Sequence, residues 1–284
     1  MRLIAGSFRI LGAEPDGDSI RFYPDDPREW SRLGGIHKVR PNAKGGAQLR
    51  LDGIDALETH YPSTKGIEHQ PLKFGQRAAA RLLTWIGFSN VIRDANERVT
   101  AANPDEVPGY VLTRGADLYG RCVALVGRAD APAASGSDVY VDVPMLRRTA
   151  NYKLLDEGLV YPTYYKKLFP DLRAAMTRRV ERARPTKGLW PDDVTENGAN
   201  IHGLQTLTDD VVVLPKLFRR LVDYLALGDG DPSLEGFPDY LAQRDDRLFI
   251  LSTGHSTGFD VVVRVNGQTV SLTHHPEDLV FEER

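Results

Sequence analysis

Two carboxylates follow an arginine at the end of a short apolar run, in the stretch Arg50-Leu-Asp-Gly-Ile-Asp55-Ala-Leu-Glu58. Carboxylate oxygens bind hard cations, and a planar guanidinium binds phosphate through paired hydrogen bonds. This combination indicates metal-dependent phosphate chemistry. A surface network of ion pairs is the ordinary alternative, and these three residues by themselves leave it open.

Two charged turns elsewhere in the chain extend this cluster. Asp16-Gly17-Asp18 precedes one predicted strand, and Asp117-Leu-Tyr119-Gly120-Arg121 connects two others. Each sequence is also common in turns with a purely structural role. Their order relative to Arg50, Asp55 and Glu58 is therefore what carries information.

The elements that must position these turns are short strands followed by helices. Apolar and alternating runs predict strands at residues 2–11, 18–23, 47–54, 109–114 and 121–127. Apolar residues at three- and four-residue spacing, bounded by Pro and Gly, predict helices at 71–87, 143–158 and 169–184. Between the second and third strands, residues 24–46 are predicted to form a long loop.

The order of these features resembles the staphylococcal nuclease (thermonuclease) family. The shared pattern is a strand entered by Asp-Gly-Asp, a strand ending in Arg-x4-Asp-x2-Glu, a helix, and a hairpin ending in Asp-x-Tyr-Gly-Arg. Phe74-Gly75-Gln76, Gly158-Leu159-Val160 and Gly188-Leu189-Trp190 are further matches. The resemblance covers residues 1–192 and implies an α+β fold, with a five-stranded OB-type β-barrel and about three helices.

The resemblance also implies a calcium site. Asp18 and Asp55 match the family's calcium-binding carboxylates, and the backbone carbonyl of Ala56 is expected as a further ligand. Ca²⁺ takes oxygen ligands in irregular geometry, so two carboxylates, a carbonyl and waters suffice. Asp16 is expected to contact these ligands without binding the cation directly.

Three further matches imply catalytic roles. Glu58 corresponds to the carboxylate that positions or deprotonates the attacking water, and Arg50 and Arg121 correspond to the arginines that clamp the scissile phosphate. Guanidinium groups stabilise the extra charge of the transition state better than lysine does. The family's usual Thr-Pro before the glutamate is Ala56-Leu57 here, so the turn that carries Glu58 is expected to be less rigid.

Substrate binding is expected from residues that follow the second predicted helix. Tyr164 aligns with a tyrosine that stacks on the substrate, and Lys166 stands at the position of its partner. Tyr165 or Tyr161 could take that partner's place in space. Packing in the core is the alternative for each tyrosine.

Composition limits the cellular setting. No apolar run in the 284 residues approaches the roughly 20 needed to cross a bilayer. Cys122 is the single cysteine, so no intrachain disulfide can form, and a cytoplasmic location is expected. Because Cys122 lies in an apolar run, we expect a core residue rather than a nucleophile.

Charge is distributed unevenly along the chain. Residues 201–284 carry 14 acidic and 7 basic side chains, whereas the rest of the chain has 29 basic and 25 acidic ones. The resemblance implies a nuclease-like domain at 1–192, and we further predict a linker at 193–207 and an acidic α/β module of unknown fold at 208–284. The acidic module could restrain the basic domain, form a homo-oligomer or dock a partner.

Within that module, the sequence predicts a helix that begins at Pro215, strands at 247–252 and 259–265, and a hairpin at Asn266-Gly267.

These features together predict a calcium-dependent nuclease that acts on DNA or RNA, with single strands preferred. The resemblance implies that cleavage leaves a 3′-phosphate. The alternative is a non-catalytic OB-fold nucleic-acid-binding protein. Degenerate family members lack some of the two arginines and three carboxylates, and this chain has all five, which favours the enzyme.

Overall fold

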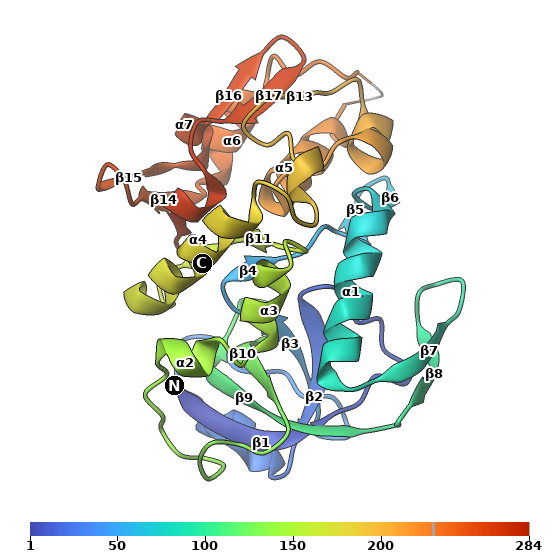
Figure 1. Ribbon diagram of the computed structural model, residues 1–284. Helices are drawn as coiled ribbons and strands as arrows, with labels where there is room; N and C mark the ends of the chain where they lie inside the picture. Colours follow the sequence, from blue (N-terminus) through green and yellow to red (C-terminus); the bar gives the residue numbers. More distant parts are fainter. Residues whose placement is uncertain (229–230, 284) are drawn as a thin grey trace.

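The first half of the chain forms a closed five-stranded barrel in the computed structural model, which describes residues 1–228 and 231–283 (Figure 1). Around the barrel the strands follow the order β1-β2-β3-β10-β9, and β9 pairs with β1 to close it. The pairs are antiparallel except β3 with β10. The strands are β1 (Arg2–Phe8), β2 (Ser19–Pro24), β3 (Ala47–Leu51), β9 (Val107–Ala116) and β10 (Cys122–Arg128). The predicted α+β class and five-stranded barrel are confirmed.

Apolar residues of alternating orientation fill the barrel. On β2, Ile20 and Phe22 are fully buried while Arg21 between them is partly exposed, as the twofold period of a strand requires. The ring of Phe22 packs against that of Phe8, with 5.1 Å between their centroids. Cys122 is also fully buried, and burial raises the pKa of its thiol to about 12. Cys122 is therefore a core residue, as expected.

Four helices lie between the barrel and the C-terminal part of the chain (Figure 1). They are α1 (Leu72–Ile86), α2 (Val143–Leu146), α3 (Ala150–Asp156) and α4 (Pro170–Ala183). The prediction of a single helix at 143–158 is wrong, because α2 ends at Leu146 and α3 begins only at Ala150. Thr149 caps α3, and its hydroxyl accepts a hydrogen bond from the backbone N–H of Tyr152 at 3.3 Å.

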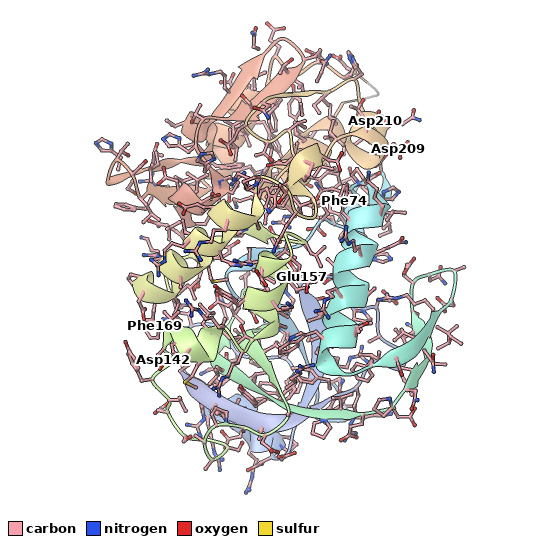
Figure 2. All side chains as sticks on the ribbon, viewed as in Figure 1. Phe74, Asp142, Glu157, Phe169, Asp209 and Asp210 are labelled. Carbon is pink, nitrogen blue, oxygen red and sulfur yellow. The ribbon has the colours of Figure 1, made fainter. Side chains whose placement is uncertain are left out.

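An ion pair joins α1 to α3. Glu157, at the end of α3, points toward α1 (Figure 2) and accepts hydrogen bonds from Arg81 at 2.7 and 2.8 Å. The two helices thereby pack as one layer against the barrel.

Short elements complete the N-terminal part. Strand β4 (Ile54–Asp55) pairs with β11 (Tyr161–Pro162), and the two remaining hairpins lie outside the barrel. These are β5 (Tyr61–Ser63) with β6 (Gly66–Glu68), and β7 (Ser89–Arg93) with β8 (Val99–Asn103). The predicted loop at 24–46 contains a 3₁₀ helix, η1 (Pro27–Arg32). Another 3₁₀ helix, η2 (Trp190–Asp192), follows α4.

In the part of the C-terminal region that the structure describes, two sheets and three α-helices lie at the end of the molecule opposite β1 (Figure 1). One sheet has the order β12 (Tyr164–Tyr165), β18 (Leu279–Phe281), β14 (Arg247–Ile250) and β15 (His255–Gly258). The other has the order β13 (Ala199–Asn200), β17 (Thr269–Leu272) and β16 (Val263–Asn266). The α-helices are α5 (Pro215–Leu225), α6 (Phe237–Arg244) and α7 (Phe259–Val262). A π-helix, η3 (Thr206–Asp210), precedes α5, and a 3₁₀ helix, η4 (Pro276–Asp278), precedes β18.

The predicted C-terminal elements are partly correct. Helix α5 begins at Pro215 as expected, but residues 259–262 form α7 rather than the start of a strand. The hairpin between β16 and β17 pairs Asn266 with Thr269, so its central residues are Gly267 and Gln268. Only Gly267 of these two has a positive φ, which does not fit the expected type I′ turn.

The predicted nuclease-like domain and the predicted acidic module share a sheet. Strand β12 of the domain pairs in parallel with β18 of the module. The predicted linker contributes β13 and the fully buried Thr195 and Ile201. The boundary at 193–207 and the oligomeric state stay predictions. Across the residues that the structure describes, no helix is both long and apolar enough to cross a bilayer.

Candidate functional site

A cavity of about 660 Å³ lies where the end of the barrel meets the C-terminal elements. The three predicted carboxylates and the two predicted arginines all line it, although they come from separate chain segments. They are Asp18 before β2, Arg50 on β3, Asp55 on β4, Glu58 after β4, and Arg121 in the turn before β10. The structure therefore brings the predicted carboxylates and arginines together.

Asp18 is held beside Asp55 by a tight turn. The carboxylate of Asp16 accepts the backbone N–H of Asp18 at 3.0 Å, and Asp18 Oδ2 accepts the N–H of Ala56 at 3.1 Å. A Cβ at Gly17 would lie 2.6 Å from the Cβ atoms of both Ala56 and Ala78. Glycine is therefore what lets this turn approach β4 and α1 so closely.

The two carboxyl groups of Asp18 and Asp55 affect each other's ionisation. Burial, together with the charges of Asp16 and Asp55, raises the pKa of Asp18 well above its usual range. Burial would also raise the pKa of Asp55, but the charges of Arg219 and Arg50 outweigh it and lower the pKa. Of the two carboxyl groups, Asp18 is therefore the one that takes up a proton more readily.

Glu58 is fixed by a residue that the sequence did not indicate. Gln70 is fully buried, and its side-chain oxygen accepts the backbone N–H of Glu58 at 3.1 Å. Its backbone N–H donates to the carbonyl of Glu58 at 2.8 Å, and its side-chain nitrogen donates to the carbonyl of Val213 at 2.8 Å. These bonds hold the turn that lacks the family's Thr-Pro. Nothing in the local sequence around Gln70 signals this role.

The two predicted phosphate-binding arginines have different surroundings. Arg50 Nη2 lies 3.9 Å from Asp55 Oδ1, and its guanidinium lies 5.3 Å from the centre of the Tyr165 ring. Arg121 is held in its own turn, where its Nε donates to Asp117 Oδ2 at 2.7 Å. Arg50 therefore lies at the carboxylates, while Arg121 lines the wall of the same cavity.

A third arginine, Arg219 on α5, contacts both acids of the opening motif. Its Nη2 donates to Asp55 Oδ2 at 2.7 Å, and its Nη1 donates to Asp55 Oδ1 at 3.3 Å and to Glu58 Oε1. Asp55 is 164 residues away in the chain, so no local sequence pattern could have indicated this contact.

The predicted substrate-binding residues are placed unevenly. Tyr164 is fully buried, with its hydroxyl 3.1 Å from that of Thr177, and it does not line the cavity. Lys166 also lies outside the cavity wall, whereas Tyr165 and Lys167 are part of it. In this structure Tyr165 is thus the predicted tyrosine that a ligand in the cavity could reach.

The donors fit a hard cation held by few protein ligands. Among residues 1–228 and 231–283, no three His, Cys, Asp or Glu side chains lie close enough together to form a metal site by themselves. The protein ligands available to a cation are the two adjacent carboxylates of Asp18 and Asp55 and the backbone of Ala56 beside them. Ca²⁺ completes such a set with waters and carbonyl oxygens.

No protein family model matches the chain, and a search of curated proteins finds no match either. The likeness to staphylococcal nucleases therefore rests on the motifs alone and stays a prediction.

Proposed function

We propose that this protein is a calcium-dependent nuclease that hydrolyses phosphodiester bonds of DNA or RNA. The observation that carries the proposal is the convergence of Asp18, Arg50, Asp55, Glu58 and Arg121 on one cavity. Carboxylates suited to a cation and guanidinium groups suited to phosphate oxygens are the two halves of a phosphodiesterase site. A site for a neutral sugar would need the acids but not the arginines.

Asp18 and Asp55, with the Ala56 carbonyl, would hold the cation. When bound, Ca²⁺ would neutralise charge on the diester and make its phosphorus more electrophilic. Because both carboxyl groups are buried or partly buried, their attraction for a cation is weakly screened by water.

Glu58 would orient the attacking water and accept its proton. Burial is the main cause that raises the pKa of Glu58, and the charge of Asp55 adds to it. A carboxylate of raised pKa is a stronger base toward water. The bonds from Gln70 fix the backbone from which this side chain reaches the cavity.

Arg50 and Arg121 would bind the non-bridging oxygens of the scissile phosphate. Each guanidinium group is planar and can donate two parallel hydrogen bonds to one phosphate. The negative charge on these oxygens grows in the transition state. The arginines therefore stabilise the transition state more strongly than they stabilise the bound substrate. Tyr165, beside Arg50, offers a ring on which a base of a single strand could stack.

A non-catalytic nucleic-acid-binding protein is the second candidate. The contact of Arg219 with Asp55 and Glu58 favours it, because in this arrangement both acids are already neutralised by the protein itself. Such a binder would retain its affinity for nucleic acid in a calcium chelator and would leave the strand intact.

The test is cleavage of end-labelled single-stranded DNA and RNA by the full chain, in calcium and in EGTA. We expect calcium-dependent cleavage that Glu58→Gln lowers by roughly 10²–10⁴-fold and Arg121→Ala by roughly 10²–10³-fold. Exposed residues outside the cavity supply matched controls, Glu106→Gln and Arg98→Ala, which should cleave at the wild-type rate. Cleavage that is unchanged in Glu58→Gln and Arg121→Ala would refute the assignment of this site.

A further inference from the structure

The C-terminal part of the chain makes three contacts at or beside the candidate site. The first two involve groups to which the proposed function assigns a ligand, and the third involves lysines next to Tyr165. The first is the pair of acids, Asp55 and Glu58, which the guanidinium of Arg219 bridges. A bound cation would need the same oxygens of Asp55. Arg219 and a cation therefore cannot both occupy this position.

The second place is the ring of Tyr165. Phe281 on β18 packs against it, with 6.1 Å between the ring centroids, and the backbone of β18 pairs with that of Tyr164 and Tyr165. The aromatic surface that a base would stack on is thus covered in part by a side chain of the same protein.

The third place is the pair of lysines that follows β12. Lys166 Nζ donates to Glu282 Oε1 at 2.5 Å, and Lys167 forms an ion pair with Glu283. A carboxylate is an anion that presents two oxygens, as a phosphate does. Glu282 and Glu283 therefore form ion pairs with the lysines that the phosphates of a nucleic acid would otherwise contact.

We propose that helix α5 and the segment Phe281 to Glu283 act as an internal inhibitor, in which Arg219 replaces the cation and Phe281 to Glu283 replace a nucleotide. This inference rests on the proposed function and concerns the regulation of the same site. The Arg219 contact has the opposite sign to the one that the net charge indicated, because a basic residue of the acidic segment binds acids of the basic domain. The contacts of Glu282 and Glu283 with Lys166 and Lys167 have the sign that the net charge indicated. The local contacts, not the overall charge, define the inhibitor.

Helix α5 is anchored by contacts that do not involve Arg219. Helix α5 is anchored by the buried Phe218, whose ring packs on Tyr61, and by the bond from Tyr61 Oη to Asp223 at 2.9 Å. Arg220 is bound separately to Asp246 at 2.6 and 3.0 Å. Release of the acids therefore requires only that the Arg219 side chain turn away, with α5 in place.

Calcium binding by the full chain tests the first contact. Isothermal titration with Ca²⁺ alone should show that Arg219→Gln binds at least tenfold more tightly than the wild type. Arg220→Gln is the matched control, since Arg220 lies on the same helix but binds Asp246, and it should keep the wild-type affinity. Calcium should also raise the melting temperature of Arg219→Gln more than that of the wild type.

Two outcomes separate this inference from the proposed function. If the wild type and Arg219→Gln bind Ca²⁺ equally well, the inhibitor is refuted while the calcium site stands. If neither binds Ca²⁺, the calcium site itself is refuted and the inhibitor falls with it. Should Arg219→Gln not fold, Arg219→Lys decides the question, because a single ammonium cannot bridge both acids and should raise the affinity by a smaller factor.

The nucleotide-like contacts are tested by fluorescence anisotropy with a labelled single strand in EGTA, where cleavage is blocked. The double change Glu282→Gln and Glu283→Gln should bind at least fivefold more tightly than the wild type. The control removes two exposed acids elsewhere in the segment, Glu235→Gln and Asp239→Asn, with the same change in net charge. Equal affinity of the two double variants would show that net charge alone acts, and would overturn this part of the inference.

Discussion

Replacement of Arg219 by glutamine should destabilise the fold when no cation is present. The side chain of Asp55 is 3% exposed and that of Arg219 is 20% exposed, so the pair is largely removed from water. Glu58, 21% exposed, shares the same guanidinium. Arg219→Gln leaves two negative groups close together, with Arg50 at 3.9 Å as the remaining nearby cation.

The size of the effect follows from burial of an unpaired charge. Removing one partner of a buried ion pair costs about 3–5 kcal/mol, because the other charge keeps its desolvation cost without its partner. Arg50 and the partial exposure of Glu58 compensate in part, so we expect a loss of about 3 kcal/mol in the free energy of unfolding. Calcium should restore much of it, since a cation binds the folded state.

The assay is urea unfolding of the full chain at neutral pH in EGTA, repeated in calcium. Arg28→Gln is the control, because Arg28 is 78% exposed and its ion pair with Asp26 lies in solvent. It should unfold at the wild-type urea concentration. If Arg219→Gln lies within about 1 kcal/mol of the wild type in EGTA, the guanidinium does not compensate buried acids and the reasoning fails.

Three further predictions concern residues around the cavity. Gln70→Ala should lower the free energy of unfolding by about 1–3 kcal/mol, because the N–H of Glu58 and the carbonyl of Val213 lose buried partners. Urea unfolding measures this loss, and an unchanged midpoint would contradict the prediction. Gly17→Ala should cost about 1–3 kcal/mol through overpacking, and should weaken Ca²⁺ binding in calorimetry by displacing Asp18, whereas Gly34→Ala, with open space around it, should do neither. Burial lowers the pKa of Lys216 to about 8 although Asp246 raises it, so the unfolded state binds more protons between about pH 8 and the ordinary value of 10.5. Stability should therefore rise with pH across that window, and Lys216→Met should remove the rise in urea midpoints measured at pH 8 and 10.

Elements with local sequence signals could be predicted before the structure was known. Alternation of apolar residues within a strand sets which side chains face the barrel, so the five barrel strands follow from short stretches of sequence. The turn at Asp16 to Asp18 and the acids after β3 were likewise recognisable, because their residue types and spacing are fixed within a few positions. The break between α2 and α3 was missed, since Arg147 and Arg148 favour helices and only the cap at Thr149 marks the new start.

Tertiary structure alone decided what lies opposite those acids. Arg219 reaches Asp55 because the apolar face of α5 packs beside β5, and that packing depends on residues distant in the chain. Gln70 reaches both Glu58 and Val213 for the same reason. Net charge could not foresee these contacts, because it sums over a whole segment while Coulomb attraction acts between particular atoms a few ångströms apart. The sequence thus identifies the groups that could do chemistry, and the fold decides which of them are already paired.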